Sequence, residues 1–230
     1  MKILALDTAT EACSAALYID GEIQQQCKMA PREHTQLILQ QAQTLLDAAG
    51  LKITQLDGLA FGRGPGSFTG VRIATSVVQG MAFGADLPVV PVSTLAAMAQ
   101  QMVQQHDATH VISAIDARMG GIYAGCYERD AAGLMRLIGV EALSAPVECV
   151  LPNAHHWIGA GTGWQTHGVA LQQRLGERVT HIYPDVWPQA GSIVLLAADD
   201  LARGLSVSAE QAQPVYLRND VAKKISEQGR

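Results

Sequence analysis

The sequence predicts an α/β fold made of two duplicated halves, each with the pattern βββαβαβα. The same pattern occurs at the start of the chain and again after residue 107: an apolar strand ends in an acid, and two more strands follow. The two acids are Asp7 and Asp116, which lie about half a chain apart. Alternating helical and extended segments follow each of these meanders. The 230 residues, 48% of them hydrophobic and 16% charged, are enough for one large domain or two small ones with a sizeable core.

In the first half, short apolar runs between turn residues predict three antiparallel strands over 3–6, 12–19 and 22–28. The two-residue turn at Asp20 and Gly21 sets a register that places Ser14, and not Cys13, opposite Cys27, so we expect no disulfide there. The four cysteines form no CxxC pair of the zinc or redox type. The segments that follow are predicted as a helix over 32–49, a strand over 59–62, a helix over 68–84, a strand over 89–92 and a helix over 94–105.

The second half repeats this order less clearly. Strands are predicted over 111–115, 122–127, 134–140, 157–159 and 179–182, with helices over 146–151, 164–175 and 190–204. We therefore predict an N-terminal half over 1–106 and a C-terminal, degenerate half over 107–212. The tail over 213–230 is expected to pack back on the first half.

Charge and apolar runs exclude several classes of protein. The net charge of −5 has the wrong sign for a nucleic-acid footprint, so we expect no direct, high-affinity tRNA binding. The apolar run before Asp7 is too short for a secretory signal, and no run is long enough to span a membrane. The sequence therefore predicts a cytoplasmic protein without a membrane partner.

The duplicated layout resembles the actin/sugar-kinase/Hsp70-like (ASKHA) superfamily, where a nucleotide lies between the halves and each first strand supplies an acid and a turn for phosphate and metal. Asp7, Thr8 and Thr10 occupy the first such loop here, and Asp116 opens the second. In that superfamily the first loop resembles Asp-x-Gly-x-Thr. Ala9 replaces the glycine of this pattern, and its Cβ restricts close approach by a phosphate. A working loop for ATP or ADP with Mg²⁺ and a vestigial loop both stay open, as does a role for both acids in binding turn N–H groups.

The densest glycine cluster, GRGPGSFTGVR over 62–72, fits none of three common motifs. No lysine follows its last glycine as in a Walker P-loop, its spacing is not GxGxxG, and Ser67 directly follows Gly66, which excludes GxSxG. The alternative is a strand-to-helix turn in which Ser67 or Thr69 caps the next helix. Such a helix N-terminus is still able to hold an anion.

Four sequence blocks together resemble the bacterial TsaB (YeaZ-type) family: LALDTAT at 4–10, FGRGPGSFTGVRI at 61–73, AIDARMGGIY at 114–123 and PVYLRND at 214–220. The resemblance implies the fold of the catalytic TsaD proteins and a role in making N6-threonylcarbamoyladenosine at position 37 of tRNAs that read ANN codons. It also implies that the chain is a non-catalytic partner of a TsaD-like subunit, that a TsaE-like ATPase joins the assembly, and that a homodimer forms when the partner is absent.

TsaD-type enzymes carry a metal-binding HxxxH motif on the helix predicted here over 94–105. By our placement Thr94 and Met98 replace its two histidines, so the metal site is expected to be missing. His106 and His110 form a literal HxxxH, but at the far end of that helix with Asp107 as its stop, so we interpret them as exposed or capping residues. Adjacent residues on a strand point to opposite faces, which argues against a metal at His155 and His156.

The helices of the first half predict a binding surface. Apolar residues cover about 200° of the helix over 32–49, more than a helix buried on one side needs. The helix over 68–84 has Arg72 as its only charge and a row of small residues at four-residue spacing. With the resemblance, this predicts contacts with a TsaD-like subunit or a second copy at Leu37, Gln41, Leu45, Gly70, Ala74 and Val78.

A different class of function stays open. The chain is alternatively a stand-alone enzyme, either a phosphotransferase that uses ATP between Asp7 and Asp116 or a peptidase. The first version requires Mg·ATP binding, and the second requires a metal or a nucleophile that the sequence does not reveal.

Overall fold

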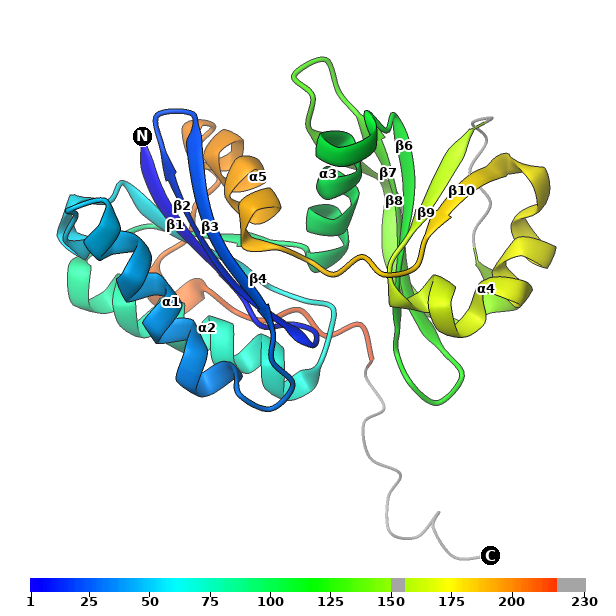
Figure 1. Ribbon diagram of the computed structural model, residues 1–230, viewed down its shortest axis with the longest axis horizontal. Coiled ribbons are helices and arrows are strands. Elements are labelled where there is room, and N and C mark those ends of the chain that lie inside the picture. Colours follow the sequence, from blue (N-terminus) through cyan, green and yellow to red (C-terminus); the bar gives the residue numbers. More distant parts are fainter. Residues whose placement is uncertain (150–155, 219–230) are drawn as a thin grey trace, which may run out of the picture.

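The computed structural model describes residues 1–149 and 156–218 and contains two five-stranded mixed sheets (Figure 1). The first sheet has the strand order β3-β2-β1-β4-β5. The second sheet, read as β8-β7-β6-β9-β10, has the same arrangement strand by strand. In each sheet three strands form an antiparallel meander and two further strands add in parallel. The predicted duplicated α/β fold is confirmed.

The strands are β1 (Lys2–Asp7), β2 (Ala12–Ile19), β3 (Glu22–Met29), β4 (Gly58–Gly62), β5 (Val89–Val92), β6 (His110–Asp116), β7 (Ile122–Arg129), β8 (Met135–Ser144), β9 (Trp157–Ala160) and β10 (Val179–Tyr183).

Local capping sets the ends of the helices. The Ser67 hydroxyl accepts the Gly70 N–H at the start of α2, and Ser93 accepts two N–H groups at the start of α3. Asp86 and Asp107 end the same two helices in the left-handed conformation, with φ of 54° and 52°. The helices are α1 (His34–Ala48), α2 (Phe68–Ala85), α3 (Thr94–His106), α4 (Thr162–Leu175) and α5 (Ala190–Ala202).

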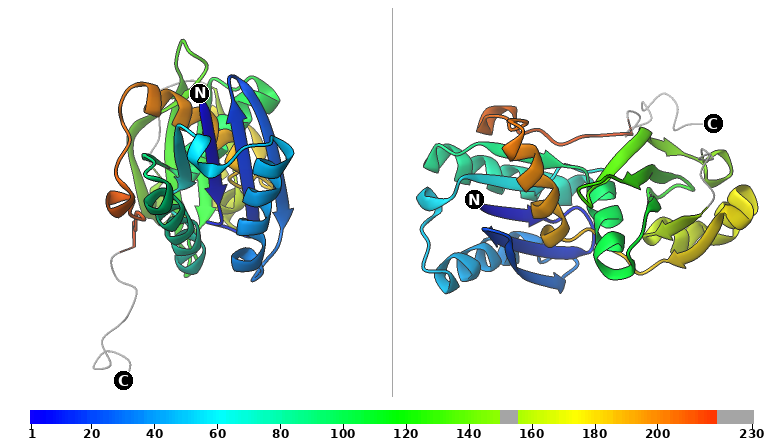
Figure 2. Two further views of the ribbon diagram at one scale, coloured as in Figure 1. Left: turned by 90° about the vertical axis from the view of Figure 1, so that its left-hand side faces the viewer. Right: turned by 90° about the horizontal axis from the view of Figure 1, so that it is seen from above.

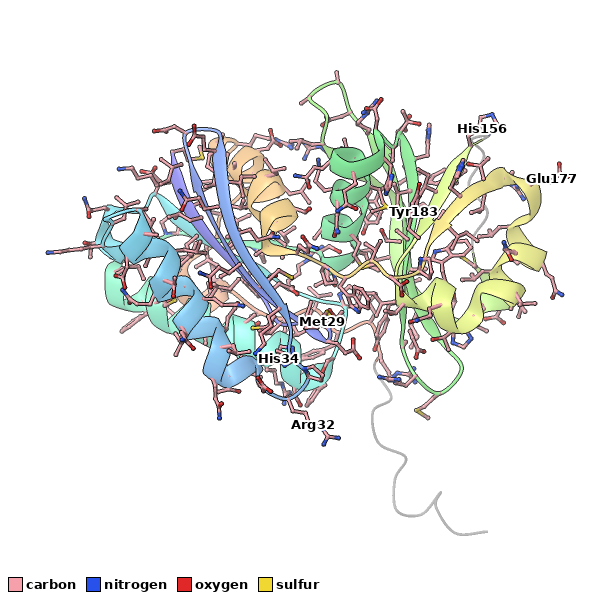
Figure 3. All side chains as sticks on the ribbon, viewed as in Figure 1. Met29, Arg32, His34, His156, Glu177 and Tyr183 are labelled. Atoms are coloured by element: carbon pink, nitrogen blue, oxygen red, sulfur yellow. The ribbon has the colours of Figure 1, made fainter. Side chains whose placement is uncertain are left out.

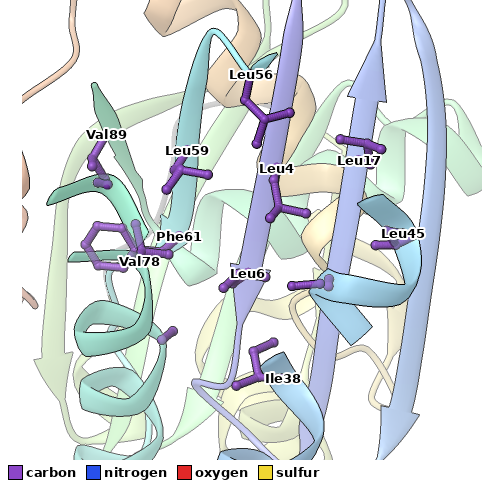
Figure 4. Packing of buried hydrophobic residues seen from close by; sticks show 14 of the residues in the cluster. Leu4, Leu6, Leu17, Ile38, Leu45, Leu56, Leu59, Phe61, Val78 and Val89 are labelled. Carbon is purple, nitrogen blue, oxygen red and sulfur yellow. The ribbon is translucent and has the colours of Figure 1, made fainter. Parts of the chain in front are cut away.

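Alternation along the strands gives each sheet two buried faces. Leu4 and Leu6 of β1 point toward α1 and α2, whereas Ile3 and Ala5 point toward α5. Figure 4 shows the first of these clusters, in which Phe61 of β4 also packs against α2. Both faces of β1 and β4 are therefore covered, whereas the edge strand β3 is mostly exposed.

The two helices that end the predicted halves cross over to the opposite sheet. Leu95, Met98 and Met102 of α3 pack on the second sheet, and Ile193 and Val194 of α5 pack on the first. Figures 1 and 2 show α3 and α5 next to each other between the sheets, with α1 and α2 on one outer face and α4 on the other. The two sheets lie on either side of residue 107, and α3 and α5 each pack across to the other sheet. An amphipathic pattern marks a buried face without saying which sheet covers it, so the division into halves stays a prediction.

Several smaller expectations have definite outcomes. Ser14 pairs with Cys27 in the β2–β3 register, and all four cysteines are free. Residues 212–216 lie along the first half, while Arg218 reaches the second; residues 219–230 lie outside the described part. The short helix predicted over 146–151 is a 3₁₀ turn at Pro146–Glu148. Across the described residues, no helix has the length and apolarity that a membrane span requires.

Candidate functional site

The first predicted phosphate loop turns its acid into the protein. Asp7 is fully buried at the end of β1, where its Oδ1 accepts the Ala9 N–H at 3.2 Å and its Oδ2 has no hydrogen-bond partner. Burial disfavours the charged carboxylate and raises the pKa of Asp7 to about 8, against a smaller lowering effect of the Ala9 N–H. The carboxyl is therefore mostly protonated near neutral pH.

The glycines of the GPGSFTG block pack closely against the backbone of this same loop. A Cβ at Gly66 would lie 2.3 Å from the Ala9 carbonyl oxygen, and one at Gly70 would lie 2.0 Å from that of Thr8. The Ser67 N–H donates to Ala9 O at 2.7 Å. Thr8 is bound from both sides, since its hydroxyl donates to Gly70 O at 2.6 Å and accepts the Ala74 N–H at 3.1 Å. The block thus binds the β1–β2 turn, and the predicted role of Ser67 as a helix cap is confirmed.

The second loop holds its acid at the surface of a cleft. The Asp116 Oδ1 accepts the Arg118 N–H at 3.0 Å and lies 3.5 Å from His167 Nε2, while Oδ2 lies 3.5 Å from the Arg118 guanidinium. Asp116 therefore binds a turn N–H group and the Arg118 guanidinium, the alternative that the sequence left open.

A cleft of about 730 Å³ separates the two loops. The N-termini of α1, α2 and α4, the β6–β7 turn and the chain after Pro214 all contribute to its walls. Met29, Arg32 and His34 line it from the end of β3 and the start of α1 (Figure 3). Of the four predicted loop residues, Thr10 and Asp116 line the cleft, whereas Asp7 and Thr8 are buried behind it. The acids that line the cleft are therefore Glu11 and Asp116, whereas Asp7 does not reach it.

The place of the HxxxH motif is filled by core side chains. The Thr94 hydroxyl donates to Pro65 O, and the Met98 side chain is buried with its Cε against Gly161. Neither has a nitrogen that is able to bind a metal. Within residues 1–149 and 156–218, no three His, Cys, Asp or Glu side chains are grouped so as to hold a metal ion.

The other histidine pairs are also explained by local contacts. His106 stacks on Tyr183 at 4.0 Å, and His110 lies beyond the helix stop at Asp107 with its ring 3.5 Å from Glu128. His155 lies outside the described residues, and His156 is exposed at the outer edge of the second half (Figure 3).

Five of the six predicted contact positions face the interior of the chain itself. Ala74 and Val78 have no exposed surface, Leu45 is 4% exposed, and Gly70 meets the β1–β2 turn. Gln41 donates from Nε2 to Cys13 O at 3.2 Å, so its polar group is satisfied by β2. Leu37 is half-buried against the same core. The small and apolar side chains of these residues pack the helices on the first sheet, and their role as partner contacts stays a prediction.

The opposite sides of α1 and α2 form an exposed surface, here called the α1–α2 face. Its exposed positions carry one charge on each helix, Asp47 and Arg72. Gly80 and Gly84 lie on it with open space where a Cβ would stand, so the packing of the chain does not require glycine at either position. The face comprises Leu39, Gln40, Gln43, Thr44, Asp47, Thr69, Arg72, Ser76, Gly80, Phe83 and Gly84.

Comparisons with known proteins extend over both halves. The family model of TsaD, described as tRNA N6-adenosine threonylcarbamoyltransferase, matches residues 26–225. The protein of Escherichia coli K12 described as tRNA threonylcarbamoyladenosine biosynthesis protein TsaB is 44% identical over 230 residues, 97% of each chain. A Haemophilus influenzae protein with the same description is 39% identical over 234 residues, covering 97% of this chain and 96% of its own. The solved structure of YeaZ from Pseudomonas aeruginosa is 46% identical with a TM-score of 0.88, covering 94% of this chain and 99% of its own.

Proposed function

Because the chain belongs to the TsaB family and thus takes part in forming N6-threonylcarbamoyladenosine in tRNA, we propose that it is the non-catalytic partner subunit of a TsaD-like transferase. The modification is made at position 37, and the chain acts in the cytoplasm by binding and activating the catalytic subunit. A TsaE-like ATPase joins the larger complex, and a second copy of the chain occupies the same surface when the partner is absent.

The observation that carries this proposal is the pair of unexplained glycines on the α1–α2 face. A glycine inside a helix costs about 1 kcal/mol relative to alanine. At Gly80 and Gly84 the chain's own packing offers no compensation, because an added Cβ meets no atom within 4 Å. A partner helix that approaches the backbone closely supplies the missing reason. Phe83, 74% exposed on the same face, is an apolar anchor for such a contact.

The scarcity of charge on the α1–α2 face supports the same proposal. The centres of protein interfaces are depleted of charged residues, and a standard interface buries about 1,600 Å² in all. Two neighbouring helices of 15 and 18 residues are long enough to supply one side of such a contact. Since the net charge of the chain is −5, we assign the RNA contacts to the partner.

The stand-alone enzyme is the weaker hypothesis. A phosphotransferase needs an ionised acid at Asp7, and that carboxyl is buried with a raised pKa. A peptidase needs a metal or an activated nucleophile, and the described residues that line the cleft offer neither.

The test is Gly80→Arg, measured by co-elution with a TsaD-like subunit and by formation of the modified nucleoside in the reconstituted system. We expect binding to weaken by about tenfold or more, since a charge and bulk enter a closely packed contact. Gly168→Arg on α4 is the matched control, because a Cβ at Gly168 also meets no atom within 4 Å, and it should bind normally. Normal binding and activity of a folded Gly80→Arg protein would refute the proposed surface.

A further inference from the structure

The last described residues of the chain are bound along their whole course. Residues 212–218, here called the tether, run from the first half beside α2 to the second half (Figures 1 and 2). Ala212 is buried and its carbonyl accepts the Gln79 side-chain N–H at 2.7 Å. The Val215 N–H donates to Arg63 O, also at 2.7 Å. The tether is thus fixed to α2 and to the glycine block before it reaches the cleft.

Tyr216 joins the tether to the exposed start of α2. The Arg72 Nε donates to the Tyr216 hydroxyl at 2.8 Å, and the guanidinium carbon lies 3.6 Å from the centre of the Phe68 ring. The Phe68 and Tyr216 rings lie 5.4 Å apart. A cation–π contact with a hydrogen bond to the second ring holds these three side chains as one unit.

Arg218 joins the tether to the β6–β7 turn of the other half. Its Nη2 lies 3.1 Å from Ala117 O and 3.4 Å from Arg118 O. The turn needs such support, because Arg118, Met119 and Gly120 all have left-handed φ, of 62°, 53° and 76°. For residues with a side chain this conformation costs roughly 1–2 kcal/mol each and persists only where neighbouring groups hold it.

We propose that the tether couples the start of α2 to the β6–β7 turn across the cleft, so that a change at Arg72 alters the turn in the other half. One residue separates Tyr216 from Arg218, and an extended chain spans only about 7 Å over two steps, so the tether has little slack. Residues 215–218 also form part of the cleft wall, which makes the coupling a control on the shape of the cleft.

Through this coupling, a contact at the α1–α2 face would change the wall of the cleft. Arg72 lies on that face, so a partner that docks there would act on the tether through Tyr216. This consequence rests on the proposed function. The coupling itself concerns contacts inside one chain, and the experiment below uses the chain alone, so either proposal is able to fail without the other.

The experiment is hydrogen exchange of the backbone amides at 117–121 in the full chain and its variants. Arg218→Ala should accelerate exchange by about threefold or more, because the turn loses its hydrogen bonds from the tether. Arg72→Ala, on the other side of the cleft, should accelerate the same amides. Tyr216→Phe, which removes only the hydroxyl that accepts from Arg72, should act in the same direction to a smaller extent.

The controls separate coupling from general loosening. Arg203→Ala removes an exposed arginine at the end of α5, outside the tether, and should leave exchange at 117–121 unchanged. The double variant Arg72→Ala/Arg218→Ala should exchange no faster than Arg218→Ala, because both changes act through one connection. Unchanged exchange in Arg72→Ala, or additive effects in the double variant, would overturn the proposal. Equal acceleration across all strands in either single variant would also overturn it.

Discussion

Replacing Asp7 by Asn removes the ionisable group of the most buried acid of the first half with little change of shape. The amide has the shape of the carboxyl, and its Oδ1 is still able to accept the Ala9 N–H. The unpartnered Oδ2 gives the charged form no compensating hydrogen bond. The substitution therefore isolates the free-energy cost of burying a carboxylate at the end of β1.

The raised pKa of Asp7 determines how stability changes with pH. The folded chain keeps a proton up to about pH 8, whereas the unfolded chain releases it near 3.8. Wild-type stability should therefore fall as the pH rises from about 4 to about 8, and the slope should vanish above that. From these two values, this one group lowers the free energy of unfolding by about 3–4 kcal/mol between pH 5 and pH 8, as an upper estimate.

Urea unfolding followed by tryptophan fluorescence at pH 5, 6, 7 and 8 measures this loss. Asp7→Asn should be more stable than wild type at pH 8, with a much smaller difference at pH 5. Asp116→Asn removes the corresponding acid of the second half without touching the Asp7 pocket and should keep the wild-type slope. Parallel curves for wild type and Asp7→Asn would show that Asp7 is ionised in the folded chain and would refute the reasoning.

Two further predictions concern the buried side of α2. Ala74→Arg should leave no folded protein in thermal unfolding, because a charge enters a position with no exposed surface at a cost above about 4 kcal/mol; a folded monomer would contradict its place in the core. Gly70→Ala should lower the free energy of unfolding by about 2–3 kcal/mol, since its Cβ would lie 2.0 Å from Thr8 O, and wild-type stability in urea would contradict this packing.

Elements were well predicted where local chemistry determines them. The strand at Val89–Val92 and the start of α2 at Phe68 lie where the sequence places them, because valine-rich runs and a serine cap act over a few residues. The packing of α3 and α5 on the opposite sheets was not predictable in this way, since it depends on how two distant parts of the chain meet.

Helix α2 carries small residues on two of its sides. The row of Gly70, Ala74 and Val78 is small because the first sheet and the β1–β2 turn lie against it. The exposed row with Gly80 and Gly84 has the same spacing, shifted around the helix. Glycine inside a helix costs free energy relative to alanine, and alanine would serve on a solvated surface. Gly80 and Gly84 are therefore the signal in the sequence for the proposed partner surface.

The backbone around the first loop limits the room for a phosphate more than the Cβ of Ala9 does. A phosphate at the start of α2 would need free N–H groups, and the Ser67 N–H already donates to Ala9 O. That oxygen also fills the space beside Gly66. A glycine in place of Ala9 would remove a Cβ and leave the oxygen where it is. The first loop is therefore part of the core that holds α2 in place.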